Sequence, residues 1–154
     1  MSSKTPYVSP PPGTPPEPAA SGLPFVFVDR SLGRIQVPRL LRAGGVHLVT
    51  LAEHYGIPQD EKVQDTTWIA ESAAQGWIAF MKDERIRRRS AEREEIQRSG
   101  ARCFCLANGN ITAAMMAERY LTNLHRIERA CTEPGPFLYA VHVARIERLG
   151  FGSL

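Results

Sequence analysis

The sequence predicts one α/β domain in which a mostly parallel sheet lies between two layers of helices. Short apolar runs alternate with longer segments whose apolar residues recur at helical spacing, and this alternation is typical of parallel sheets. With 154 residues, 43% of them hydrophobic, the chain has the size of one ordinary domain with one core. We find no internal repeat.

Residues 1–22 differ in composition from the rest of the chain. The segment MSSKTPYVSPPPGTPPEPAASG is rich in proline and carries almost no large apolar side chain. Such a composition cannot build a packed core, so we expect a disordered or polyproline-like tail. A ligand for a proline-recognising module is the alternative interpretation. The single folded domain is predicted to span residues 23–154.

Five apolar runs are predicted to form the sheet. The first, PFVFVD, is rich in Val and Phe and stops abruptly at Asp29, where the chain turns polar. The third run is followed in the same way by Asp83. The last run is expected at an edge of the sheet. In chain order the runs are residues 24–29, 46–51, 77–82, 102–107 and 137–146.

Four helices are predicted between these runs, and most have a recognisable start or stop. Pro38 lies in the first turn of the first helix, and Gly44 ends it. Asp65 occupies the N-cap position of the second helix, which Gly76 closes. The third helix is highly charged and ends at Gly100, and the fourth is the longest. The four segments are residues 37–45, 65–76, 84–99 and 111–130.

Three aspartates are predicted to meet at one edge of the sheet. In open parallel sheets, ligands bind beyond the carboxyl ends of the strands, where Asp29 and Asp83 lie. Asp65 starts a helix that follows a strand and its loop, so it opens onto the same edge. Each aspartate taken alone can be explained as a cap or turn residue. Three converging carboxylates would repel one another unless a cation lay among them, and oxygen ligands suit Mg²⁺ or Mn²⁺.

Two segments carry these acids, FVFVDRSLGRIQVPRLLRAGG and DTTWIAESAAQGWIAFMKDERIRRR. They resemble a short PIN-like domain of the bacterial VapC-type toxin group, over roughly residues 24–107. The resemblance implies a three-layer α/β/α nuclease that holds Mg²⁺ or Mn²⁺ on acidic residues and hydrolyses RNA. Asp29, Asp65 and Asp83 match the family's acids and are the candidate catalytic and metal-binding residues. The resemblance also implies a cognate antitoxin protein and a homodimer.

Fuller members of that group carry a further acid on a helix between the first two matched positions. Here the chain between Asp29 and Asp65 is shortened, and the candidates are Glu53, Asp60 and Glu61, none of which matches a motif cleanly. A second hypothesis therefore stays open. In it, the chain is a PIN-like domain that has lost catalysis and works as an RNA-binding or protein-interaction module.

Basic and polar residues beside the acids are candidates for RNA contacts. Arg30 and Ser31 directly follow the first acid, where they could contact the scissile phosphate. Lys82, Arg85 and Arg88 flank the last acid, where they could contact the RNA backbone. The alternative interpretations are a turn after the first strand and a solvated, ion-paired helix face after the third.

The sequence argues against several other classes of protein. No apolar stretch approaches the roughly 20 residues needed to cross a bilayer, and the N-terminus lacks the pattern of a signal peptide. We therefore expect a cytoplasmic protein with no membrane partner. Three cysteines give no disulfide framework, and the spacing of Cys103 and Cys105 fits no zinc pattern, so we assign both to the core.

Overall fold

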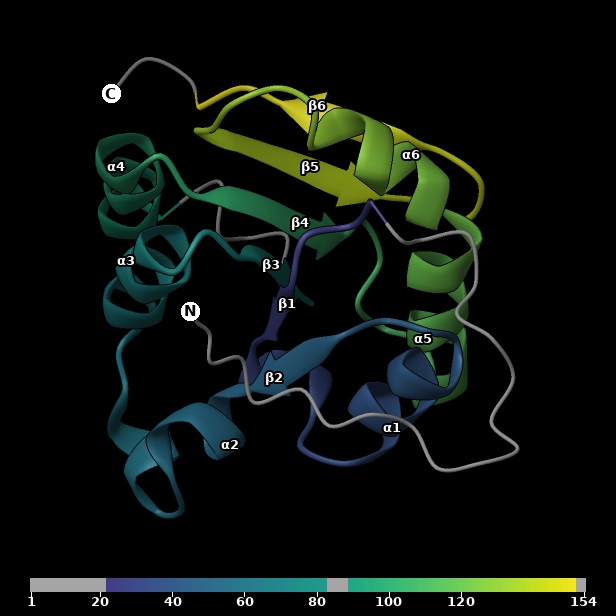
Figure 1. Ribbon diagram of the computed structural model, residues 1–154, viewed down its shortest axis with the longest axis horizontal. Helices are drawn as coiled ribbons and strands as arrows, with labels where there is room; N and C mark the ends of the chain where they lie inside the picture. The colour runs from purple at the N-terminus through teal and green to yellow at the C-terminus, as the bar shows by residue number, and fades with distance from the viewer. Residues whose placement is uncertain (1–21, 83–88, 152–154) are drawn as a thin grey trace.

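A six-stranded, mostly parallel sheet forms the centre of the protein (Figure 1). The computed structural model describes residues 22–82 and 89–151. The strands are β1 (Val26–Val28), β2 (Leu48–Thr50), β3 (Ile78–Met81), β4 (Arg102–Leu106), β5 (Phe137–Val141) and β6 (Ile146–Leu149). They lie in the order β2-β1-β3-β4-β5-β6, and β6 alone among them runs antiparallel to its neighbour. The predicted α/β fold is confirmed.

Helices cover both faces of this sheet and make a three-layer α/β/α structure. They are α1 (Gln36–Ala43), α2 (Leu51–Tyr55), α3 (Asp65–Ala74), α4 (Ser90–Ser99), α5 (Ala113–Thr122) and α6 (Leu124–Ala130), with 3₁₀ turns η1 (Arg30–Leu32) and η2 (Gln59–Lys62). α3 and α4 lie on one face, and α1, α5 and α6 lie on the other (Figure 1). Within the described residues, every helix falls short of the length and apolarity that a membrane span requires.

Alternate residues of the central strands point into two separate cores. In β1, Val26 and Val28 face the core under α1, α5 and α6, whereas Phe27 faces the core under α3 and α4. All three side chains are buried. Because both faces of the sheet are covered, its central strands are continuous apolar runs. Cys103 and Cys105 are buried in the second core, as predicted.

The C-terminal third differs from the sequence prediction in two places. The predicted edge strand 137–146 contains the β5 strand and the start of β6, joined by a turn that a 2.8 Å hydrogen bond from the His142 amide closes. The predicted helix 111–130 is broken into α5 and α6 at Asn123. Asn123 is fully buried, and its side-chain amide donates to the carbonyl oxygens of Arg119 and His142. The break therefore ties the helices to the hairpin.

Two further helix boundaries differ from the prediction. The short helix α2 was not predicted, although Thr50 and Glu53 form a reciprocal capping box at its start. Helix α4 begins at Ser90, so it covers only the second part of the predicted helix 84–99. Residues 84–88 of that prediction lie outside the described residues.

Candidate metal centre

Asp29 lies at the carboxyl end of β1, which is flanked by the edge strand β2 and by β3. Its backbone amide donates to the Phe80 carbonyl oxygen of β3 (3.0 Å), which extends the ladder between the two strands. Asp29 also caps η1, because its Oδ2 accepts a hydrogen bond from the Ser31 amide (3.2 Å). The residue is 7% exposed. The end of β1 therefore holds this carboxylate in a fixed position.

The other carboxylate oxygen of Asp29, Oδ1, is unsatisfied within the described residues. Oδ1 is buried, and no donor in residues 22–82 or 89–151 hydrogen-bonds to it. Burial raises the pKa of Asp29 above its usual value; the hydrogen bonds from Ser31 lower it, and the negative charge of Asp65 raises it again. A buried carboxylate with an unsatisfied oxygen is costly unless a cation or a proton compensates it. These properties are those expected of a carboxylate that binds a cation.

Asp65 contributes a second carboxylate whose charge acts on Asp29. It is the first residue of α3, and the cap position predicted for it belongs to Gln64. Its Oδ1 accepts a hydrogen bond from the indole nitrogen of Trp68 (3.0 Å), and its Oδ2 lies 3.5 Å from the Arg89 guanidinium. Trp68 is buried in the second core, so it orients the carboxylate firmly.

Asp83, the third predicted acid, lies outside the described residues. The residue before it is well defined, because the Lys82 amide donates to the Ser31 Oγ (3.0 Å) at the turn that follows β1. The described part of the chain contains no group of three His, Cys, Asp or Glu residues that could hold a metal ion. Asp29 and Asp65 are therefore the two predicted ligands that the structure brings near each other.

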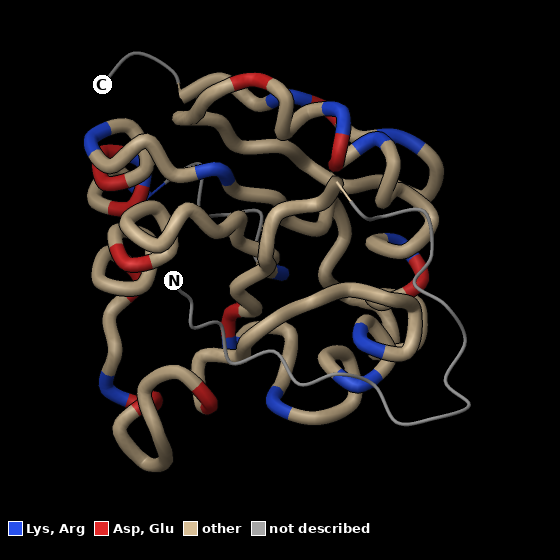
Figure 2. Tube along the Cα trace, viewed as in Figure 1, with Lys and Arg blue, Asp and Glu red and all other residues tan. Residues whose placement is uncertain are grey.

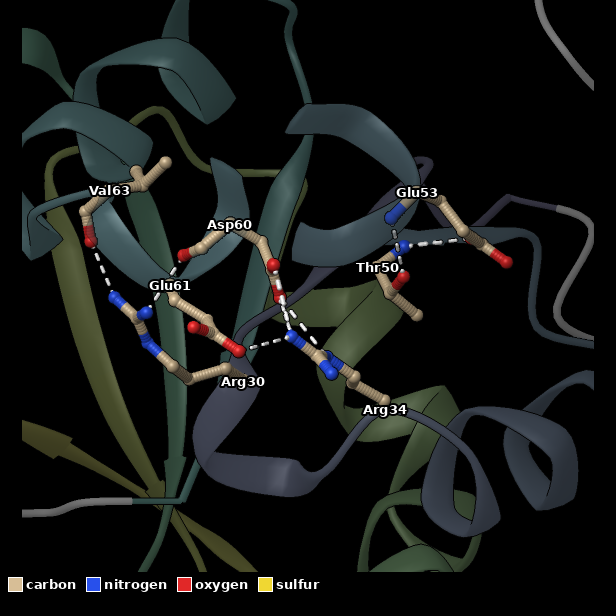
Figure 3. Close-up of polar contacts among 7 residues, drawn as sticks. All are labelled: Arg30, Arg34, Thr50, Glu53, Asp60, Glu61 and Val63. Carbon is tan, nitrogen blue, oxygen red and sulfur yellow. Dashed lines mark hydrogen bonds and ion pairs between the residues drawn. The ribbon is translucent and has the colours of Figure 1, made fainter. Parts of the chain in front are cut away.

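Asp60 and Glu61, two of the candidates for a further acid, are both engaged by Arg34 (Figure 3). Asp60 is 1% exposed, and its carboxylate accepts hydrogen bonds from the Arg34 guanidinium at 2.8 to 3.1 Å. Glu61 is exposed and lies 3.3 Å from the same guanidinium. Both carboxylates thus pair with Arg34.

Glu53, the remaining candidate, is used at the start of α2. Its Oε1 accepts a hydrogen bond from the Thr50 amide (3.0 Å), and the carboxylate pairs with Arg42 at 2.7 Å. Burial raises the pKa of Glu53, but the hydrogen bonds from Arg42 and Thr50 lower it by more, so the net shift is downward. Glu53 therefore stabilises local structure at the start of α2, and each of the three candidates for the further acid has a protein partner.

Two arginines tie η1 to the loop that leads into α3 (Figure 3). Arg30 donates from Nη1 to the Asp60 carbonyl oxygen (2.8 Å) and from Nη2 to the Val63 carbonyl oxygen. Arg34 binds the Asp60 carboxylate on the same loop. We call Arg30, Arg34 and Asp60 the arginine clamp. Arg30, predicted to contact RNA, thus has a structural use, and nothing in the local sequence indicated that Arg34 would reach this loop.

The other candidates for RNA contacts lie close to the acids or outside the described residues. Ser31 accepts the hydrogen bond from Lys82 with its hydroxyl and donates its amide to the first acid. The Lys82 side chain lies against Gly109, where an added Cβ atom would be 2.9 Å from the Lys82 Cγ. Arg85 and Arg88 fall in the segment that the structure does not describe.

Tyr120 supports the end of β3 and was not singled out from the sequence. Its hydroxyl is fully buried, accepts a hydrogen bond from the Met81 amide (3.2 Å), and lies within donating distance of the Met81 and Phe104 carbonyl oxygens (2.6 and 2.9 Å). Burial raises the pKa of Tyr120 well above its usual value, so the hydroxyl stays protonated.

Comparisons with known proteins agree with this architecture. The sequence model of the family described as PIN like domain matches residues 24–108. A protein of Mycobacterium tuberculosis (strain ATCC 25618 / H37Rv) named "Putative ribonuclease VapC45" is 49% identical over 127 residues, which make up 82% of this chain and 92% of that protein. No solved structure gives a significant match. The family match covers more than half of the chain, including Asp29 and Asp65 at the carboxyl edge of the sheet. The chain therefore belongs to the PIN-like domain family.

Proposed function

We propose that this protein is a metal-dependent endoribonuclease that hydrolyses RNA phosphodiesters. The Asp29 carboxylate carries the proposal, because it is buried, has no partner for Oδ1 among the described residues and feels the charge of Asp65. Membership of the PIN-like family supports the proposal, as does the ribonuclease name of the mycobacterial relative.

Asp29 and Asp65, with Asp83 as the third ligand expected from the sequence, would hold the metal ion. All three offer carboxylate oxygens, which are the donors that Mg²⁺ and Mn²⁺ prefer. The unsatisfied Oδ1 of Asp29 fits this assignment, since a cation compensates a buried and unpaired carboxylate oxygen. When bound, such an ion stabilises charge on the phosphoryl oxygens and lowers the pKa of water.

The chain's own residues orient these carboxylates. The Ser31 amide holds one oxygen of Asp29, and the Trp68 indole holds one oxygen of Asp65. The amino end of α3 adds a positive potential that favours both a carboxylate and an incoming phosphate. Lys82, beside Ser31 at the end of β3, is the basic residue best placed to contact the RNA backbone.

In this proposal the protein is the toxin of a type II toxin-antitoxin pair, acts in the cytoplasm and forms a homodimer. The likeness to the VapC-type group supports these points. The alternative function is a catalytically weak or inactive module that binds RNA or protein. One observation favours the alternative, namely that Glu53, Asp60 and Glu61 all have structural partners, so no further acid is evident among them.

The direct test is cleavage of total cellular RNA by the purified protein with Mg²⁺ or Mn²⁺. The comparison samples are the same reaction with EDTA, the Asp29→Asn variant, and the Glu94→Gln variant, which removes an exposed carboxylate from α4. We expect cutting by the wild type and by Glu94→Gln, and none with EDTA or with Asp29→Asn. If the folded wild type cuts nothing with either ion, the binding module becomes the better explanation.

A further inference from the structure

A pocket of about 450 Å³ opens beyond the carboxyl ends of β4 and β5. It is formed by the residues that follow β4, by helix α5 and by the turn between β5 and β6. Its lining comprises Ala107, Asn108, Arg119, His142, Val143, Ala144 and Arg145. Neither Asp29 nor Asp65 of the candidate metal centre is among these residues.

The pocket lies on the same edge of the sheet as Asp29. Strands β1, β3, β4 and β5 are adjacent and parallel, so their carboxyl ends line up along that edge. Three strand spacings separate β1 from β5, which corresponds to roughly 14 Å. A few nucleotides of a single RNA strand cover this distance.

Lys82 lies between the two places. It follows β3, and its side chain runs against Gly109 in the loop whose neighbouring residue, Asn108, lines the pocket. A side chain at position 109 would collide with Lys82, so glycine permits this close approach. The edge between the Asp29 site and the pocket thus carries a basic residue.

The charge of the pocket suits a phosphate group. Two arginines, Arg119 and Arg145, line it, and no carboxylate of the described residues does. One acid pairs with residues of the lining: the Glu147 Oε1 lies 3.0 Å from His142 and 3.8 Å from Arg145. In the part of the chain that the structure describes, no carboxylate forms an ion pair with Arg119. Over α5, α6 and the β5–β6 hairpin, basic residues outnumber acidic ones, which are interspersed among them (Figure 2).

The rest of the lining suits the uncharged part of a nucleotide. Ala107, Val143 and Ala144 provide small apolar surface, and Val143 is 62% exposed. Asn108 adds a polar side chain at the rim. The pocket is held rigid from behind, because buried Asn123 bonds the carbonyl oxygens of Arg119 and His142. A preformed cavity with two cations and an apolar wall can take a phosphate together with its ribose or base.

We propose that this pocket is a subsite for a nucleotide of the RNA substrate, a few positions away from the bond that is cut. The proposal rests on the proposed ribonuclease function and names where the flanking part of the substrate binds. Arg119 and Arg145 bind the backbone phosphate, the apolar wall contacts the ribose or base, and Lys82 guides the strand between the subsite and the acids.

The test measures RNA binding in the absence of cutting. Each protein carries Asp29→Asn, and the anisotropy of fluorescein-labelled single-stranded RNA is followed as protein is added. The variant combines Arg119→Ala and Arg145→Ala. The control is Arg129→Ala, an exposed arginine at the far end of α6, close in sequence to the start of β5 and so at the opposite edge of the sheet. Circular dichroism and thermal unfolding verify that all three proteins are folded.

We expect the double variant to bind a long RNA about tenfold more weakly. In a plot of log affinity against log salt concentration, its slope is expected to be shallower by about 0.7 for each phosphate that it no longer binds. Arg129→Ala is expected to bind as the parent does. An RNA shortened until it cannot reach from the acids to the pocket is expected to bind parent and double variant equally. Equal binding of the long RNA, or an equal loss for both RNAs, would overturn the proposal.

The two proposals fail in different ways. If the protein with all its acids cuts no RNA while the length-dependent effect of the two arginines persists, catalysis is refuted and the subsite stands. If that protein cuts RNA while the double variant binds long RNA normally, the ribonuclease stands and the subsite is refuted.

Discussion

Asp29 carries a charge that the folded chain stabilises poorly. Its burial is the largest cause of its raised pKa, and its Oδ1 has no donor among the described residues. In the unfolded chain the same carboxylate is hydrated. When the pKa of an acidic group is higher in the folded state than in the unfolded state, the free energy of unfolding falls as the pH rises from the unfolded-state pKa through the folded-state pKa. At neutral pH, then, Asp29 opposes folding, and this cost is the physical mark of a binding residue.

We therefore expect Asp29→Asn to raise the melting temperature by a few degrees at neutral pH without metal, and to raise it less at a pH near 4, where the unfolded carboxyl also takes up protons. Thermal unfolding in EDTA at both pH values measures this difference. Added Mn²⁺ is expected to stabilise the wild type and to leave the variant unchanged. A wild type more stable than Asp29→Asn in EDTA at neutral pH would contradict the expectation.

Tyr120 acts at the same scale through the backbone. Its hydroxyl accepts a hydrogen bond from the Met81 amide and lies within donating distance of the carbonyl oxygens of Met81 in β3 and Phe104 in β4. Removing it in Tyr120→Phe leaves these buried groups without that partner, which costs about 1–3 kcal/mol. Denaturant unfolding is expected to show this loss with an unchanged dependence on denaturant concentration. A variant as stable as the wild type would mean that water or neighbouring backbone satisfies those groups.

At the scale of elements, the arginine clamp connects the turn after Asp29 with the loop before Asp65. Asp60 is at the centre of this clamp, because its carboxylate binds Arg34 and its carbonyl oxygen binds Arg30. Buried carboxylates that bind an arginine in this way fix backbone geometry. The separation of the two acids of the candidate site therefore depends on a residue that does not belong to that site.

Asp60→Asn is expected to weaken Mn²⁺ binding about tenfold, as changes in the groups that position metal ligands generally do, and to lower the melting temperature by several degrees. Glu61→Gln is the matched control, since Glu61 is an exposed partner of the same arginine and surface pairs contribute little. Titration with Mn²⁺ followed by electron paramagnetic resonance measures the affinity. If a folded Asp60→Asn protein binds Mn²⁺ as tightly as the wild type, the arginine clamp stabilises the fold but does not position the metal-binding acids.

Elements whose signals are local were predictable from the sequence, and elements defined by distant contacts were not. The run ending at Asp29 and the helix opening at Asp65 follow from local apolar periodicity and polar punctuation. The break at Asn123 does not, because it depends on a hydrogen bond to His142 across the fold. For the same reason the clamp was missed: Arg34 and Asp60 meet only after the two loops have packed together.

At the scale of the whole molecule, the alternation of strands and helices was sufficient to predict three layers and a mostly parallel sheet. The strand order was beyond reach, since alternation alone does not say that β1 lies between β2 and β3. The domain start was predicted from composition. It stays a prediction; among the described residues, the first buried strand begins at Val26.

Deletion of residues 1–21 is accordingly expected to leave the melting temperature within about 2 °C of that of the full chain. The physical reason is that the composition of this segment offers almost no large apolar side chain to a core, and that residues 23–151 supply all the described members of both cores. Differential scanning calorimetry of the full and shortened chains provides the comparison, and RNA cleavage by both serves as a check on the site. A large loss of stability would show that the segment packs on the domain.

The edge strands β2 and β6 affect how other proteins can bind to this one. β2 is only three residues long, and the Arg42 guanidinium donates to its Leu48 carbonyl oxygen (3.0 Å). At the other border, the Arg148 guanidinium lies over the Phe137 ring (5.8 Å) and pairs with Glu133. Short edge strands that carry or adjoin charged side chains discourage the addition of another strand. We expect a protein partner to dock on helices or loops, and we expect the chain to resist fibrillar growth at high concentration.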